Sequence, residues 1–147
     1  MTTPRPKGHS TVVPFLVNEN MDQLVDFLVK SFNAEELYRL NDDKGKIWHS
    51  QIKIGDSVMM AGDSMGQHPA SPMNLYVYVD NADEMHRRAI DNGATSIAEP
   101  SMQFYGDRVA AVKDFAGNIW WLATHQEDLS YEDMTKRARE MMQKRAA

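Results

Sequence analysis

The clearest indication of the fold lies in the stretch Asn74-Leu-Tyr-Val-Tyr-Val79. It is followed by the Asp80-Asn81 pair and by a segment that ends at Gly93. Residues 74–79 alternate polar or aromatic side chains with aliphatic ones, which is typical of a strand with one buried face. Asn81 is a good N-cap and Gly93 a typical C-terminal stop, so a helix is predicted over 81–92. The β-rich runs 95–97, 107–113 and 118–124 predict three further strands.

The same order of elements precedes this stretch. A strand is predicted at 12–17, a helix at 20–33 with Asn20 as its N-cap, and three strands at 37–40, 47–54 and 57–61. Corresponding positions in the two halves lie 60 to 62 residues apart, as shown by Val17 and Val79, Ala34 and Ala94, and Met60 and Trp121. This near-constant offset indicates a duplicated unit, with chance similarity of two βαβ-like patterns as the alternative.

The predicted fold class is α+β, with duplicated βαβββ modules that form a curved mixed sheet with a concave cavity. We expect a single domain over 1–147, with module 1 at about 10–62 and module 2 at about 72–125. The capping box Ser130-Tyr-Glu-Asp133 predicts a further helix over about 130–145. Two interpretations of this C-terminal helix stay open: it docks on the body, or it contacts a second copy or another partner.

The composition excludes several classes of protein. The chain has 147 residues, a net charge of −5 and no cysteine. An acidic chain does not fit a general nucleic-acid binder, and the lack of cysteine excludes disulfides, thiolate zinc sites and a cysteine nucleophile. The first ten residues hold no apolar segment, and no run is long enough to span a membrane. We therefore expect a soluble, cytoplasmic protein without nucleic-acid or membrane partners.

Strand alternation assigns side chains to the two faces of the sheet. The aliphatic residues at 75, 77 and 79 are expected under the helices, so their neighbours in the strand face the cavity. By the repeat, Val12, Pro14 and Leu16 take this face in the first half, whereas Trp48 goes with the buried set. The predicted lining is His49, Gln51, Met60, Asn74, Tyr76, Tyr78 and Trp121. Such an apolar, aromatic surface with a few polar groups is typical of a small-molecule site. The alternative is that Met60 and Trp121 fill the space.

Arg108 is a further candidate, because it lies before a strand at the expected mouth of the cavity. A guanidinium group there could bind an anionic ligand with two hydrogen bonds. The alternative is a structural pair with Asp107 or with an acidic residue near the C-terminus.

Short motifs follow one another along roughly residues 10–140: Val13-Pro-Phe-Leu-Val17, Trp48-His-Ser-Gln-Ile-Lys-Ile-Gly-Asp-Ser57, Tyr76-Val-Tyr-Val-Asp80, Asn92-Gly-Ala94, Phe104-Tyr-Gly-Asp-Arg108, Lys113-Asp-Phe-Ala-Gly117 and Ala123-Thr-His-Gln-Glu-Asp128. In this order, on a duplicated unit, they resemble the vicinal oxygen chelate superfamily of glyoxalase I, bleomycin-resistance proteins and extradiol dioxygenases, and most of all its PhnB-like branch. The resemblance implies paired modules, a homodimer and a small-molecule cavity on the concave side.

In that superfamily four side chains, one near the start and one near the end of each module, usually hold a divalent metal that acts as a Lewis acid. The resemblance implies Val12, Met60, Asn74 and Trp121 at these positions. Three of them offer no hard donor, and asparagine alone is a poor ligand. We therefore expect no bound metal and no cofactor, which argues against glyoxalase, extradiol-cleaving and metal-dependent antibiotic-opening activities.

The histidines do not form a replacement metal site, because none are paired at a helical spacing of four residues. His9 and His68 are expected in an arm and a loop, and His86 on the solvent face of a helix. His49 and His125 lie on or beside strands, so either could enter the cavity.

Three functions remain open. The first is a metal-independent small-molecule-binding protein that holds an aromatic or planar ligand, as drug-sequestering members of the superfamily do. The second is a metal-free isomerase, lyase or cyclising enzyme that uses His49 or Tyr78 for proton transfer. The third is a structural or partner-binding role of the C-terminal helix.

Overall fold

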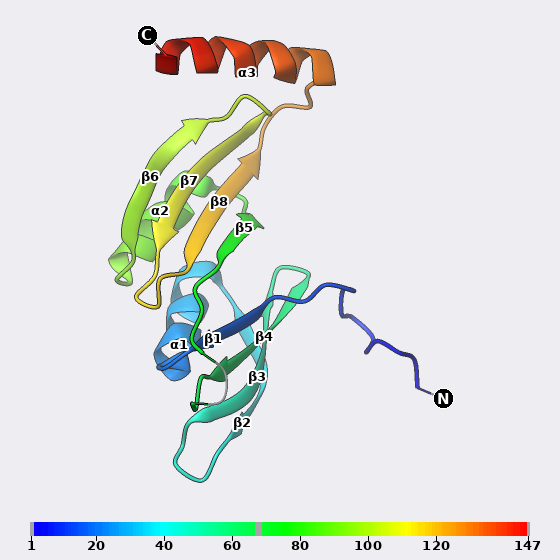
Figure 1. The fold of residues 1–147 in the computed structure, drawn as a ribbon, viewed down its shortest axis with the longest axis vertical. Coiled ribbons are helices and arrows are strands. Elements are labelled where there is room, and N and C mark those ends of the chain that lie inside the picture. The colour runs from blue at the N-terminus through cyan, green and yellow to red at the C-terminus, as the bar shows by residue number, and fades with distance from the viewer. Residues whose placement is uncertain (1, 67–68, 147) are drawn as a thin grey trace.

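The computed structural model describes residues 2–66 and 69–146 (Figure 1). The first half holds β1 (Phe15–Asn18), α1 (Met21–Phe32), β2 (Glu35–Asn41), β3 (Ile47–Ile54) and β4 (Ser57–Asp63). The second half holds β5 (Asn74–Tyr78), α2 (Ala82–Asp91), β6 (Thr95–Met102), β7 (Asp107–Lys113) and β8 (Ile119–His125), and α3 (Tyr131–Ala146) follows. His68, predicted in a loop, lies outside the described residues.

Each half forms its own four-stranded sheet, in the orders β1-β4-β3-β2 and β5-β8-β7-β6. β1 pairs parallel to β4, and β5 parallel to β8, whereas the other pairs are antiparallel. Figure 1 shows the two sheets one after the other along the long axis of the molecule. The predicted α+β class with duplicated βαβββ modules is confirmed.

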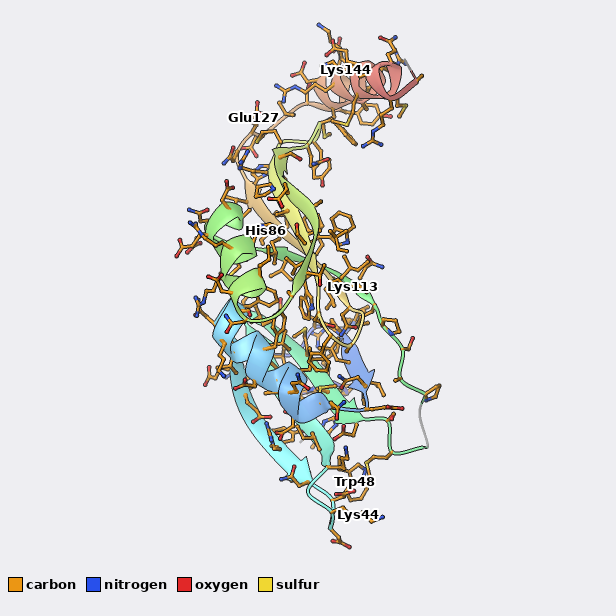
Figure 2. The ribbon with its side chains drawn as sticks, turned by 90° about the vertical axis from the view of Figure 1, so that its left-hand side faces the viewer. Lys44, Trp48, His86, Lys113, Glu127 and Lys144 are labelled. Atoms are coloured by element: carbon orange, nitrogen blue, oxygen red, sulfur yellow. The ribbon has the colours of Figure 1, made fainter. Side chains whose placement is uncertain are left out.

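One helix covers one face of each sheet, and the two helices lie on the same side of the molecule (Figure 2). The hydrophobic core runs through both modules, because Phe32 at the end of α1 packs on Trp120 of β8 with ring centroids 5.2 Å apart. Arg88 of α2 adds polar links to the end of α1, with hydrogen bonds to the carbonyl oxygen of Lys30 (2.7 Å) and to Oδ1 of Asn33 (2.8 Å). The modules are therefore joined by one continuous core.

The register of the first strand differs from the prediction by one residue. Phe15 lies opposite Met60 in the first sheet, and Tyr76 lies opposite Trp121 in the second, so the structural offset is 61 at both strands. The offset of 62 that aligns Val17 with Val79 places β1 one position out, and a shift of one residue moves every side chain to the other face. The predicted placement of Leu16 on the concave side is therefore wrong, and this side chain is fully buried in the core.

The helix ends are fixed by side chains that the sequence identifies only in part. Asn81 caps α2 as predicted, because its Oδ1 accepts from the backbone N–H of Glu84 at 3.1 Å. Asn20 makes no such bond at α1. The carboxylate of Asp63, on β4, takes its place: it accepts from the N–H groups of Met21 (3.1 Å) and Ile47 (2.7 Å). A capping group distant in sequence leaves no local signal.

His86 on α2, which Figure 2 labels, is another correction. The neighbouring arginines predict a solvent-facing histidine, but His86 is only 5% exposed, and its Nε2 lies 2.9 Å from the hydroxyl of Ser96 on β6. The helix places position 86 against the sheet, where a hydroxyl satisfies the ring nitrogen.

Helix α3 stands beyond the end of the second sheet (Figure 1), and none of its described residues is buried. Docking on the body is therefore wrong for the single chain. Its tie to the body is the ion pair between Arg137 and Glu127, with N–O distances of 3.0 and 3.1 Å. None of the described helices combines the length and apolar character needed to cross a bilayer.

The shared core predicts a large effect of Trp120→Phe on stability. This fully buried indole packs on Phe32, and its Nε1 donates to Oδ2 of the buried Asp114 at 2.8 Å. The substitution leaves a cavity and removes a hydrogen bond to a charged group. We therefore expect the free energy of unfolding, measured by urea unfolding followed with circular dichroism, to fall by about 2–3 kcal/mol. Tyr131→Phe, at an exposed site on α3, is the control with a loss below about 0.5 kcal/mol. Equal losses would contradict the shared core.

Candidate functional site

The face of each sheet that lies opposite its helix is here called its open face. The open face of the first sheet carries Phe15, Tyr38, His49, Gln51 and Met60, and that of the second carries Asn74, Tyr76, Tyr78, Trp121, Asp107 and His125. Many of these aromatic rings are exposed, including those of Phe15, Tyr76 and Tyr78. Large apolar side chains left open to solvent over a contiguous area mark a binding surface.

His49 lies between two aromatic rings on the first open face. Its ring centroid is 6.3 Å from that of Phe15 and 5.7 Å from that of Tyr38. A cavity of about 320 Å³ lies beside them and is also lined by Trp48. The predicted burial of Trp48 is wrong, because this residue is 66% exposed. The β2–β3 register shifts between Leu40 and Asn41, and such a bulge breaks the alternation on which the prediction depends.

A larger cavity, of about 710 Å³, lies where the edge strands β1 and β5 approach each other. Phe15 lines it from the first module, and Asn74, Tyr76 and Tyr78 line it from the second. Trp121, in the neighbouring strand β8, donates from Nε1 to Oδ1 of Asn74 at 3.0 Å. Three of the predicted lining residues thus meet in one cavity, with Trp121 beside them.

The other predicted lining residues lie elsewhere on the first sheet. Gln51 and Met60 are paired neighbours of β3 and β4, and Met60 lines a separate space under the N-terminal arm. His49 lines the smaller cavity described above. Within one chain, the described residues therefore do not enclose all of the predicted lining in one cavity.

A buried carboxylate organises the polar part of the second open face. Asp107, at the start of β7, is only 1% exposed and accepts three hydrogen bonds from side chains. The hydroxyls of Tyr76 (2.7 Å) and Tyr78 (3.1 Å) bond its Oδ2, and Nδ1 of His125 bonds its Oδ1 at 2.7 Å. Both tyrosine rings therefore extend from β5 across β8 to reach β7. This arrangement holds the two rings in place at the cavity.

Two more side chains extend this network. The hydroxyl of Tyr105 lies 3.1 Å from that of Tyr76, and Oδ1 of the exposed Asp128 lies 2.7 Å from Nε2 of His125. Sequence reasoning overlooked Asp107 as a site residue. The available signal is the alternation of β7, which places Asp107 on the same face as Val109 and Ala111, opposite His125.

The hydrogen bonds set the charge of each member. Burial alone would raise the pKa of Asp107, but the bonds from Tyr76, His125 and Tyr78 outweigh it and lower that pKa. The carboxylates of Asp128 and Asp107 raise the pKa of His125. Burial and hydrogen bonds to Asp107 and Tyr105 raise the pKa of Tyr76, and the hydrogen bond to Asp107 raises that of Tyr78. Asp107 is therefore ionised at neutral pH and both tyrosines are neutral.

Arg108 is not part of this open face. Its side chain is on the helix-covered side of β7, where Nε (2.6 Å) and Nη2 (2.9 Å) donate to the two carboxylate oxygens of Asp83 in α2. Ligand binding by Arg108 at the cavity is thus not supported, and its structural partner is neither Asp107 nor a C-terminal acid. The reason is alternation: Asp107 takes the position that faces the cavity, so its neighbour faces the helix.

The four metal positions implied by the resemblance do not fit a metal. The structural offset of 61 makes Val13, rather than Val12, the counterpart of Asn74, and neither valine has a donor atom. Oδ1 of Asn74 already accepts from Trp121, and the Met60 thioether is a soft ligand. Among residues 2–66 and 69–146 there is no group of three or more histidine, aspartate, glutamate or cysteine side chains arranged to hold a metal ion.

Paired βαβββ modules are the fold of a known class of proteins. Residues 9–122 match the profile of the Glyoxalase/Bleomycin resistance protein/Dioxygenase superfamily, and the chain belongs to this superfamily. An uncharacterized protein of Mycobacterium tuberculosis strain H37Rv is 29% identical over 132 residues, which cover 82% of this chain and 78% of the relative.

Solved structures agree with this assignment. TioX from Micromonospora sp. ML1 superposes with a TM-score of 0.68 at 25% identity, over 79% of this chain and 98% of that one. The PhnB protein from Bacillus cereus, described as a putative 3-demethylubiquinone-9 3-methyltransferase, superposes with a TM-score of 0.64 at 17% identity, over 78% and 99% of the two chains. The predicted resemblance to the superfamily is confirmed, and the similarity to the PhnB protein is one of fold.

The Asp107 network predicts unequal effects of two aspartate substitutions. Asp107→Asn replaces a buried acceptor of three hydrogen bonds by an amide, so we expect a loss of about 2–3 kcal/mol in the free energy of unfolding at pH 5.5. Asp128→Asn removes a fully exposed partner of His125, so its effect on the free energy of unfolding should be much smaller. Both variants should lower the pKa of His125 in an NMR titration.

The pH dependence follows from the directions of the two shifts. The pKa of Asp107 is lowered by folding, so its stabilisation is present above about pH 4 and is lost as the pH falls through the folded value. The pKa of His125 is raised, so its stabilisation is present below about pH 6.5 and is lost as the pH rises through the folded value. The difference in the free energy of unfolding between wild type and Asp107→Asn should thus be largest between about pH 4 and about pH 6.5. A constant difference from pH 3 to pH 9 would contradict the network.

Proposed function

We propose that this protein is a metal-independent small-molecule-binding protein of the glyoxalase and bleomycin-resistance type, which holds an aromatic or planar ligand against the open faces of its sheets. The observation that carries the proposal is the cavity of about 710 Å³ with Phe15, Tyr76 and Tyr78 in its lining. Aromatic rings give a planar ligand large contact area at low cost in conformational entropy.

The fixed positions of the rings support this proposal. Tyr76 and Tyr78 are held by Asp107, and their ring centroids lie 5.4 Å apart in an edge-on arrangement. Trp121 is held by its hydrogen bond to Asn74. A ligand would meet rings already placed by the fold, so little side-chain entropy is lost on binding.

Independence from metal is part of the same proposal. It is supported by the donor set at the implied metal positions, where Val13 and Trp121 offer no ligand atom and Oδ1 of Asn74 is already hydrogen-bonded. A divalent ion needs several oxygen or nitrogen ligands to offset its lost hydration.

The enzyme alternative receives less support. The hydroxyl hydrogen of Tyr78 is already donated to Asp107, and this bond raises the pKa of Tyr78, so the phenolate that a general base requires is disfavoured. His49 lies between Phe15 and Tyr38, where it contributes to an aromatic surface. We therefore place His49 and Tyr78 in binding rather than in proton transfer.

We further propose a homodimer in which the open faces are covered by a second copy of the chain. The support is the exposure of large apolar groups there: Leu40, 56% exposed, is paired with His49, and Trp48, 66% exposed, lines the cavity beside His49. Surfaces of this kind are stable in water when a partner or ligand covers them. A specific interface would bury more than about 1,000 Å² in total.

Binding of a panel of planar aromatic compounds, with acridone among them, tests the ligand proposal by isothermal titration calorimetry. We expect binding that persists in EDTA, and an affinity about tenfold lower for Phe15→Ala, because this ring lines the cavity and its loss removes a stacking contact. Tyr131→Ala, on the remote helix α3, is the control that keeps the wild-type affinity. Loss of binding in EDTA would overturn metal independence, and an unchanged affinity of the Phe15→Ala variant would place the ligand elsewhere.

The dimer proposal is tested by multi-angle light scattering at high micromolar concentration. We expect twice the chain mass of 16.7 kDa for the wild type and a shift towards monomer for Trp48→Glu, which puts a charge on the open face. Met142→Glu, on the exposed side of α3, should remain a dimer. A monomer that forms only in the Met142→Glu variant would assign the contact to the C-terminal helix instead.

A further inference from the structure

The hydroxyl groups of Tyr76, Tyr78 and Tyr105 on the second open face all donate their hydrogens to acceptors within the protein. An ionised carboxylate only accepts hydrogen bonds, so Tyr76 and Tyr78 are the donors to Oδ2 of Asp107. Because the hydrogen of Tyr76 is used in this way, Tyr105 must be the donor in its 3.1 Å contact with Tyr76. The direction of all three bonds is therefore fixed: two end at the buried carboxylate of Asp107, and the third ends at the hydroxyl oxygen of Tyr76.

The tyrosine hydroxyls of this face can therefore offer a ligand hydrogen-bond acceptors, through their oxygen lone pairs, but no donors. Tyr78 is 66% exposed, and among the described residues its hydroxyl has one hydrogen bond, the one that it donates to Asp107. A hydroxyl that donates to a carboxylate becomes a stronger acceptor, because hydrogen bonds in a chain polarise one another. The hydroxyl oxygen of Tyr78 is thus an acceptor on the second open face, where the ring reaches Asp107 at the start of β7.

The charges around the hydroxyl oxygen of Tyr78 also favour a hydrogen-bond donor on the ligand over an anionic group. Asp107 and Asp128 carry two negative charges, and the imidazolium of His125 between them carries one positive charge. Both nitrogens of His125 already bond these carboxylates, so its N–H groups are not available to a ligand. The cluster has a net negative charge and is unfavourable for an anionic group.

We infer that the ligand of this site presents an N–H or O–H donor to the hydroxyl oxygen of Tyr78, and that ligands which offer only acceptors or an anionic group there bind more weakly. This inference rests on the proposed function, since it specifies the polarity of the second open face, against which the ligand is proposed to lie. A ligand acceptor could bond Tyr78 only if the hydroxyl left Asp107, which would remove one donor from a buried charge.

Acridone and xanthone form a matched pair of probes for this inference. Both are planar, uncharged tricyclic ketones, and they differ in that a ring N–H of acridone is replaced by a ring oxygen in xanthone. We expect the wild-type protein to bind acridone about fivefold more tightly in calorimetric titrations, because only acridone can donate to Tyr78.

Substitution of the tyrosine locates the preference. Tyr78→Phe removes the acceptor and keeps the ring, so the two affinities should become equal, mainly through weaker binding of acridone. The variant is expected to fold, since Asp107 keeps its bonds from Tyr76 and His125. Tyr131→Phe, the same change at an exposed site on α3, should keep the fivefold preference.

The outcomes separate this inference from the proposed function. Equal or tighter binding of xanthone by the wild type overturns the inference and leaves aromatic binding standing. A preference for acridone that persists in Tyr78→Phe also overturns it. Binding of neither compound nor of any other planar aromatic compound in the panel overturns the proposed function and the inference together.

Discussion

Each module provides one helix for a four-stranded sheet, and a sheet has two faces. α1 and α2 cover one face each and share a continuous core through Phe32 and Trp120. The other faces keep exposed aromatic side chains, and no described helix packs on them. The βαβββ unit thus gives its two faces different roles: one face holds the molecule together, and the other is free to vary its residues.

The fold was predictable where local patterns carry it. Alternation in residues 74–79 places Asn74, Tyr76 and Tyr78 on one face, and the Asn81 cap and Gly93 stop define α2. The first strand was misplaced because its match to the second half was read at 62 residues instead of 61. The second strand of the second module, β6, was predicted too short, since it continues through a proline that an edge strand tolerates.

The site was predictable only in part, because its geometry depends on contacts between strands. A bulge exposes Trp48, and the pairing of β7 with β8 brings Asp107 to His125. Alternation alone could have separated Asp107 from Arg108, but it could not name Asp83 as the partner of Arg108, since that pairing needs the position of α2. Likewise, the cap from Asp63 to α1 spans 42 residues. Such partners become visible only when the chain is folded.

The loop before β7 has an evolutionary consequence. Gly106 has φ +101°, and a Cβ atom there would lie 2.2 Å from the carbonyl oxygen of Glu127, whose N–H in turn donates to the oxygen of Gly106. A larger residue would displace Asp107 on one side and the segment that leads to α3 on the other. Sequence drift is therefore expected to be uneven: the exposed aromatic residues meet no such steric limit, whereas a side chain in place of this glycine would collide with Glu127.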